Sequence, residues 1–188
     1  MKKIWMLSPL ALLFACGGEQ ETTTTTTPTT PTEPVEEVIP EPVYTPDTAY
    51  DQTIQDYLKK KKWDGVKHES GMYVVTENAG EGEERPNLLD EVTIFYKGYL
   101  LNDTLFDGTN TEPATFPLQN LIAGWQIGIP MFGKGGKGKL IIPPGLAYGP
   151  NDNTDQDGNV IIPGNSVLMF EIELIDWNKA PAQPQIFW

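Results

Sequence analysis

From Gly71 to Trp177 the sequence consists of short apolar segments that glycine and proline separate. The last segment alternates: four apolar side chains share one face of an extended strand, Leu168, Phe170, Ile172 and Leu174, and three others share the opposite face, Met169, Glu171 and Glu173. A period of two residues indicates a half-buried strand in an antiparallel sheet. Segments 72–77, 91–101 and 137–142 have a similar β pattern. This part of the chain is therefore expected to form mainly antiparallel β structure.

One internal stretch, residues 120–128, has the spacing of a helix instead. Leu121, Ile122 and Trp125 would lie on one side of this short helix and face the sheet. Residues 71–177 are enough for one hydrophobic core. The predicted fold class is α+β, a curved antiparallel β-sheet wrapped over one short α-helix.

An extra N-terminal helix is predicted ahead of this domain: residues 48–70 should form an amphipathic helix and a connector. Its apolar side chains recur at helical spacing, at Tyr50, Ile54, Tyr57 and Leu58. Thr48 or Asp51 can cap its start, and the lysines at positions 59–62 lie where a helix C-terminus favours positive charge. These lysines could contact anionic lipid or simply be solvated at the helix end.

The N-terminus has the pattern of an export signal. Two lysines precede an apolar run that is too short to span a bilayer, so residues 1–15 are predicted to be a signal peptide. The sequence Leu13-Phe14-Ala15-Cys16 resembles the bacterial lipobox, in which cleavage falls before a cysteine that is then acylated. This resemblance implies a lipidated Cys16 and a membrane-anchored lipoprotein, by analogy in the outer membrane, on its periplasmic or cell-surface face. A plain signal peptide with an incidental cysteine is the alternative.

Residues 16–47 are rich in threonine, proline and glutamate, and they include six consecutive threonines. Such a composition cannot bury enough apolar surface to offset the entropy lost on chain ordering. We predict a disordered tether here, with a proline-motif ligand or a glycosylated stalk as the alternative. Residues 178–188 are expected to form a C-terminal tail.

The composition also excludes several classes of site. One cysteine cannot form an intramolecular disulfide, and one histidine without thiol partners cannot complete a usual zinc site. A formal net charge of −13 argues against nucleic acid as a partner. No cofactor is expected.

An acidic loop provides one candidate for a metal site. Asn153, Asp155 and Asp157 precede Gly158 at the spacing of the first half of a calcium-binding loop. Gly164 stands where the bidentate glutamate would complete the loop. A bound calcium ion and a solvated acidic turn therefore both remain open, and no other metal site is predicted.

Six sequence blocks, in unbroken order, are similar to those of a known family. They are Val92–Leu100, Leu105–Thr109, Leu121–Trp125, Ile142–Gly149, Ile162–Pro163 and Leu168–Leu174. Together they resemble the FKBP-type peptidyl-prolyl cis-trans isomerases over residues 71–177, and the preceding helix and lipidated tether resemble the membrane-anchored bacterial branch. The resemblance implies an FKBP-like fold, proline-containing polypeptide substrates, macrolides as further ligands and membrane attachment through the lipid. The chain is expected to be a monomer.

The resemblance also implies which residues form the site. The matching catalytic positions are Tyr96, Phe106, Asp107, Ile122, Trp125, Tyr148 and Phe170, and the matching substrate-binding positions are Phe116, Leu121, Ile161 and Ile162. Trp125 would form the floor of a proline pocket. The backbone N–H of Ile122 and the hydroxyl of Tyr148 would donate hydrogen bonds to substrate carbonyls. Asp107, held by Tyr96, would face the rotating amide.

Arg85 is the only arginine of the chain. Relatives place an arginine near the pocket aspartate, so Asp107 is expected to keep the hydrogen bond from Tyr96 but to lack an ionic partner.

Rotation about the peptide bond before proline breaks no covalent bond, and its barrier of about 18–20 kcal/mol reflects lost amide resonance. An apolar aromatic pocket disfavours the charge-separated planar amide more than the twisted one, and this difference lowers the barrier. With the resemblance, this chemistry predicts an isomerase that speeds the folding of exported proteins. A non-catalytic module that holds clients in the same pocket is the alternative.

Overall fold

The computed structural model describes residues 47–180. The predicted signal peptide, the lipid site Cys16, nearly all of the predicted tether and the last eight residues of the tail lie outside the described residues. Within residues 47–180, no helix has the length and apolar character needed to cross a membrane.

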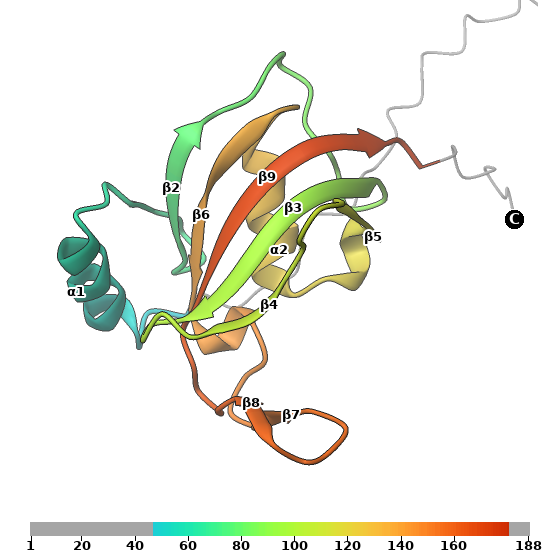
Figure 1. The fold of residues 1–188 in the computed structure, drawn as a ribbon. Helices are drawn as coiled ribbons and strands as arrows, with labels where there is room; N and C mark the ends of the chain where they lie inside the picture. Colours follow the sequence, from blue (N-terminus) through green and yellow to red (C-terminus); the bar gives the residue numbers. More distant parts are fainter. Residues whose placement is uncertain (1–46, 181–188) are drawn as a thin grey trace, which may run out of the picture. The chain divides into compact units, whose positions relative to one another are not determined.

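The described part of the chain is built on one antiparallel sheet, with strand order β1-β2-β6-β9-β3-β4, and β5 also pairs with β3 (Figure 1). Its strands are β1 (Val66–Lys67), β2 (Tyr73–Asn78), β3 (Glu91–Leu100), β4 (Leu105–Gly108), β5 (Ala114–Pro117), β6 (Gly136–Ile142) and β9 (Leu168–Asn178). A separate small hairpin pairs β7 (Asn153–Thr154) with β8 (Val160–Ile162). The four segments that the sequence predicted as strands correspond to β2, β3, β6 and β9, and the α+β fold class is confirmed.

Helix α2 (Ala123–Gly128) lies on the concave face of the sheet, and the strands curve around it (Figure 1). Three short 3₁₀ turns complete the helical structure: η1 (Leu118–Asn120), η2 (Ile129–Met131) and η3 (Pro144–Leu146). A Cβ atom on Gly124 would lie 2.5 Å from the Ile142 side chain, so the missing side chain allows the helix to approach the sheet closely. The helix begins three residues later than predicted, because Ile122 is extended and forms its N-cap.

The alternation in β9 is confirmed by burial. Leu168, Phe170, Ile172 and Leu174 all belong to the core cluster under α2. Met169 faces the other side, as predicted, but it is also buried.

Helix α1 (Asp51–Lys61) explains the burial of Met169, because it covers one end of the convex face of the sheet (Figure 1). Its buried side chains share a second core cluster with residues that face outward from the strands; the cluster contains Ile54, Tyr57, Leu58, Tyr73, Val75, Ile141, Val167 and Met169. The sheet is therefore covered by apolar side chains from both sides at this end.

The predicted cap of α1 is wrong in detail. Tyr50 is the N-cap, and no side-chain hydrogen bond caps the helix. The Asp51 carboxylate is engaged elsewhere: it accepts a 2.7 Å hydrogen bond from the Tyr73 hydroxyl and lies 2.8 Å from Lys67 Nζ. The backbone carbonyl of Thr48, rather than its side chain, accepts from the Asp51 N–H.

Candidate active site

A small apolar cavity of about 140 Å³ lies between α2 and the concave face of the sheet. Its lining comes from several elements that are distant in sequence: Tyr96, Asp107, Phe116, Leu121, Ile122, Trp125, Tyr148 and Phe170. The structure thus brings together six of the seven predicted catalytic positions and two of the four predicted substrate-binding positions. We call this cavity the aromatic pocket.

Trp125 is the centre of the aromatic pocket and is only 5% exposed. The rings of Tyr96, Phe116 and Phe170 meet its indole edge-to-face, with centroids 5.0, 6.4 and 5.1 Å away. Edge-to-face contacts of this kind add stability beyond the buried area, so they hold the pocket in one shape. The indole Nε1 is buried and has no hydrogen-bond partner among residues 47–180, an uncommon situation for a buried donor.

The polar rim of the pocket is formed by Tyr96 and Asp107. The Tyr96 hydroxyl donates a 2.9 Å hydrogen bond to Asp107 Oδ2, and the Gly108 N–H donates to Asp107 Oδ1 at 2.8 Å. The expected contact is therefore present, and no ion pair of Asp107 is found within the described residues.

Two phenols near this carboxylate keep their protons at neutral pH. Burial, helped by the hydrogen bond to Asp107, raises the pKa of Tyr96 to about 12. Burial also raises the pKa of Tyr148, and the negative charge of Asp107 adds to the effect. The Tyr148 hydroxyl is therefore available as a hydrogen-bond donor at the mouth of the pocket, where this side chain is 44% exposed.

Gln126 and Gly98 support the pocket, and the sequence reasoning did not single them out. Gln126 Nε2 donates to the carbonyls of Leu121 at 2.8 Å and Gln119 at 3.0 Å, which fixes the turn before α2. A Cβ atom on Gly98 would lie 2.7 Å from the Phe106 ring and 2.8 Å from the Phe170 ring. The signal for Gly98 was a glycine inside an otherwise regular strand, which often marks close approach by another group.

Three predicted positions lie outside the lining of the aromatic pocket. Phe106 packs edge-to-face on Phe170, a wall of the pocket, with ring centroids 5.6 Å apart. Ile162 is 5% exposed and belongs to the core, whereas Ile161, its neighbour in β8, is 37% exposed. Successive strand residues point to opposite sides, so these two side chains cannot both face one cavity.

The acidic loop is explained by its own hydrogen bonds. Asp155 Oδ1 accepts from the backbone N–H groups of Asp157 and Asn159, and Asp155 Oδ2 accepts from the Asn159 side chain. These bonds hold the pKa of Asp155 below its usual value. Among residues 47–180 no three His, Cys, Asp or Glu side chains come together as a metal site.

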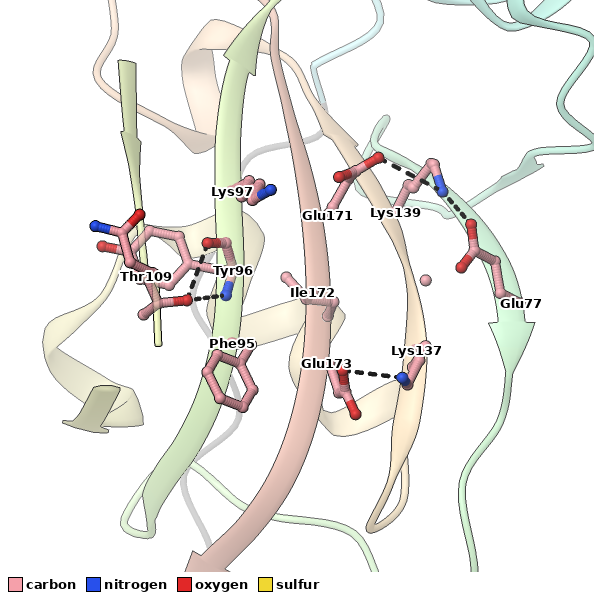
Figure 2. A pocket seen from close by; sticks show the side chains of 12 residues that line it. Glu77, Phe95, Tyr96, Lys97, Thr109, Lys137, Lys139, Glu171, Ile172 and Glu173 are labelled. Carbon is pink, nitrogen blue, oxygen red and sulfur yellow. Dashed lines mark hydrogen bonds and ion pairs between the residues drawn. The ribbon is translucent and has the colours of Figure 1, made fainter. Parts of the chain in front are cut away.

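A larger hollow of about 290 Å³ lies on the opposite, convex face of the sheet (Figure 2). Its charged side chains come from four neighbouring strands: Glu77, Lys97, Lys137, Lys139, Glu171 and Glu173. Lys139 lies between Glu77 and Glu171, and Lys137 pairs with Glu173 at 3.0 Å. Opposite charges thus neutralise each other across the strands, and this surface lacks the apolar cage that a proline ring needs. The aromatic pocket is therefore the candidate site.

Comparison with known proteins agrees with this geometry. The family model for FKBP-type peptidyl-prolyl cis-trans isomerases matches residues 82–175, half of the chain. The chain belongs to the FKBP-type peptidyl-prolyl cis-trans isomerase family. The matched residues include every residue that lines the aromatic pocket, so the candidate site lies wholly within the matched FKBP domain.

Individual FKBP relatives show the extent of the similarity. FkpA from Buchnera aphidicola subsp. Schizaphis graminum is 44% identical over 124 residues, which cover 64% of this chain and 47% of the relative. The crystal structure of FkpA from Escherichia coli superposes with a TM-score of 0.59 at 37% identity, covering 72% of this chain and 62% of that one. AtFKBP13 gives 0.54 at 33% identity and covers 60% and 98% of the two chains. The chain spans about half the length of the curated FkpA relatives it matches.

Proposed function

We propose that the chain catalyses cis-trans isomerisation of peptide bonds that precede proline. The observation that carries the proposal is the aromatic pocket itself: an indole floor, three aromatic walls and a rim with Asp107 and the protonated Tyr148 hydroxyl. The family and its FkpA relatives support the same activity.

Each part of the site has a task in this reaction. The flat proline ring would rest on Trp125 between the aromatic walls, and burial there removes water from the amide. The Tyr148 hydroxyl and the backbone N–H of Ile122 would hold the carbonyls of the bound peptide. The apolar surroundings raise the energy of the polar planar amide more than that of the twisted amide, so the rate rises without a covalent intermediate.

Proline-limited refolding of a substrate protein tests the proposal against simple client binding. The uncatalysed step takes tens to hundreds of seconds, so acceleration by the full chain is easily resolved. We expect the slow phase to become faster in proportion to enzyme concentration. Unchanged or slower refolding, with measurable binding of the unfolded substrate, would support the non-catalytic module instead.

We also propose that the site accepts macrolides that bind this family, and that the protein is a monomer. The aromatic pocket supplies the apolar cage that such ligands require. Macrolide binding is tested by competition: a proline peptide that occupies the same pocket should inhibit the binding of a labelled macrolide. Sedimentation of the full chain over a range of concentrations tests whether the protein is a monomer.

We further propose that Cys16 carries a lipid and holds the protein at the outer membrane, where it would act on exported polypeptides. The support is the lipobox-like sequence before Cys16 and the Thr/Pro/Glu-rich segment that follows it. Metabolic labelling with palmitate should mark the parent but not Cys16→Ser. Protease treatment of intact cells then separates cell-surface from periplasmic exposure, and recovery of unlabelled parent in the soluble fraction would contradict the anchor.

A further inference from the structure

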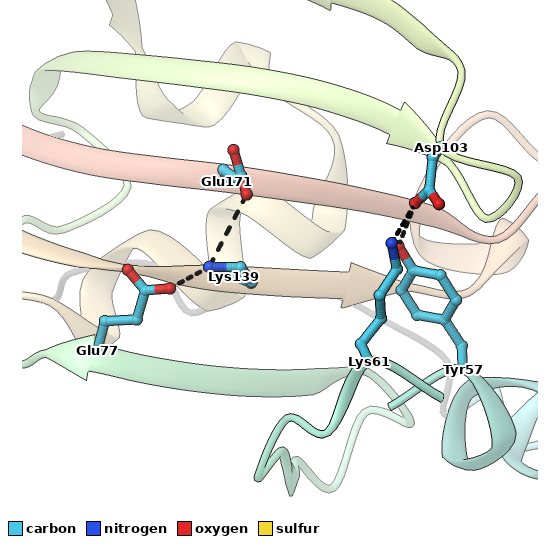
Figure 3. Close-up of polar contacts among 6 residues, drawn as sticks. All are labelled: Tyr57, Lys61, Glu77, Asp103, Lys139 and Glu171. Atoms are coloured by element: carbon cyan, nitrogen blue, oxygen red, sulfur yellow. Dashed lines mark hydrogen bonds and ion pairs between the residues drawn. The ribbon is translucent and has the colours of Figure 1, made fainter. Parts of the chain in front are cut away.

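The segment that carries α1 contacts two turns that lead into the aromatic pocket. At its start, Asp47 Oδ2 accepts a 3.1 Å hydrogen bond from the backbone N–H of Gly145. At its end, Lys61 Nζ lies 2.6 Å from Asp103 Oδ1, and the Tyr57 hydroxyl donates to the same oxygen at 3.3 Å (Figure 3). Gly145 lies three residues before Tyr148, and Asp103 lies four residues before Asp107.

The contact of Asp47 fixes the turn that carries Tyr148. This turn is closed by the carbonyl of Pro144, which accepts hydrogen bonds from the N–H groups of Ala147 at 3.0 Å and of Gly149 at 2.9 Å. A Cβ atom on Gly145 would lie 2.9 Å from Asp47 Oδ2, so the carboxylate packs directly on the turn. A closed turn moves as a unit, and a shift at Gly145 therefore also moves Tyr148.

Asp47 is itself held in place by backbone contacts. Its N–H donates to the carbonyl of Ser70 at 3.0 Å, and its Oδ1 accepts from the Ala49 N–H at 3.1 Å. The carboxylate is therefore a fixed support for Gly145.

The contact of Lys61 and Tyr57 fixes the turn that leads into β4. Asp103 occupies the tip of this turn with φ of 69°, a left-handed conformation that aspartate tolerates better than most residues. Its N–H donates to the carbonyl of Leu100 at 2.9 Å, which closes the turn. Phe106 and Asp107 follow within four residues, so a displaced tip would displace both the ring that packs on Phe170 and the rim of the pocket.

We propose that Asp47, Tyr57 and Lys61 are positioning residues of the isomerase site. The proposal rests on the proposed function. None of the three lines the pocket, so each acts through the turn that it holds: Asp47 through Tyr148, and Tyr57 with Lys61 through Asp107. The segment from Asp47 to Lys61, which includes α1, thus contacts both turns.

The first test compares Asp47→Ala with two matched variants in the full chain. We expect kcat/KM to fall about three- to tenfold in Asp47→Ala, the change that loss of one hydrogen bond produces. Asp47→Asn can keep one oxygen acceptor toward the Gly145 N–H but loses the second acceptor, which faces the Ala49 N–H, so it should recover part of the activity. Asp56→Ala, on the exposed side of α1, should have the parent's activity, because the Asp56 carboxylate bonds only to Gln52 within the helix among the described residues.

A double-mutant cycle separates positioning from a purely structural role. If Asp47 acts through Tyr148, Asp47→Ala should cost no further activity once Tyr148→Phe has removed the hydroxyl. Likewise, Lys61→Met should cost no further activity in a chain that already carries Asp107→Ala. Lys59→Met, an exposed change in the same turn of α1, is the control and should leave kcat/KM unchanged.

The outcomes distinguish this inference from the proposed function. Parent-level activity in Asp47→Ala and Lys61→Met, or losses that simply multiply with those of the site variants, would overturn the positioning role while the enzyme stands. An inactive parent chain would overturn both. Should Asp47→Ala fail to fold by circular dichroism, Lys61→Met, alone and combined with Asp107→Ala, provides the comparison at the second turn, and the same two outcomes decide it.

Discussion

The Tyr96 hydroxyl donates to Asp107 Oδ2 at 2.9 Å, and the two side chains come from neighbouring strands, β3 and β4. Thr109 fixes the backbone on which this pair depends: its hydroxyl accepts from the Tyr96 N–H at 2.9 Å and lies 3.2 Å from the Tyr96 carbonyl. The rim of the pocket is thus a product of strand pairing as much as of side-chain chemistry.

The raised pKa of Tyr96 predicts a loss of stability in alkali. The pKa is about 12 in the folded protein, against about 10 for an unperturbed tyrosine. A pKa that folding raises contributes stability that is complete below the unfolded value and is lost as the pH rises through the folded value. The free energy of unfolding should therefore fall between about pH 10 and about pH 12.

Urea unfolding of the parent and of Tyr96→Phe at several alkaline pH values checks this prediction. Tyr96→Phe should show a shallower decline, although not a flat one, because burial and Asp103 also raise the pKa of Tyr57 to about 12. Equal slopes in the two proteins would show that Tyr96 makes no contribution.

Replacing Tyr148 by phenylalanine should lower activity without lowering stability. Loss of the hydroxyl removes one hydrogen bond to substrate, so we expect kcat/KM to fall about three- to tenfold. The side chain is 44% exposed, and the free energy of unfolding should change by less than about 0.5 kcal/mol. Tyr99→Phe, on the other face of the sheet, is the control; a loss of activity in this control equal to that in Tyr148→Phe would refute a specific role for the hydroxyl.

Gly98→Ala should damage the pocket wall and the fold together. The new methyl group would lie within 3 Å of both the Phe106 and the Phe170 rings, which must then shift. Overpacking of this kind costs about 1–3 kcal/mol of stability. We expect a lower thermal midpoint and weaker proline-peptide binding. Lys97→Ala, the next residue in the strand and on the opposite face, should show neither effect, and a normal Gly98→Ala protein would contradict the tight packing.

Ile54→Ala should destabilise the whole described unit, although it lies on the far side of the sheet from the pocket. Ile54 is fully buried between α1 and the sheet, and truncation of such a side chain costs about 2–5 kcal/mol. A single cooperative unfolding transition at lower denaturant is expected, with Thr53→Ala as the exposed control in the same helix. A separate early transition for α1 would mean that the helix does not share the stability of the domain.

The sequence predicted most of the structure on the concave face of the sheet, because the patterns that indicate it are local. The period of two in β9 and the apolar spacing around Trp125 each follow from the geometry of one element. Eight of the eleven positions matched through the family resemblance line one cavity, with Tyr96 and Asp107 in the expected contact.

The packing of α1 on the convex face could not be predicted in the same way, because it depends on contacts between distant segments. Met169 and Ile141 occupy outward-facing strand positions, and only the packing of α1 shows why they are apolar. The carboxylate of Asp51, expected as a cap, is instead engaged by Tyr73 and Lys67 across the interface. The placement of Ile161 and Ile162 likewise depends on how the β7–β8 hairpin leaves the sheet.

The most direct test of the isomerase activity is NMR exchange spectroscopy on a short peptide with one proline, in the presence of the full chain. This measurement follows the cis-trans exchange rate itself and separates turnover from binding. We predict that catalytic amounts of the parent accelerate exchange, and that Asp107→Ala and Tyr148→Phe, both folded, accelerate it less. Peptide binding with an unchanged exchange rate would contradict the central claim that the aromatic pocket is an isomerase site.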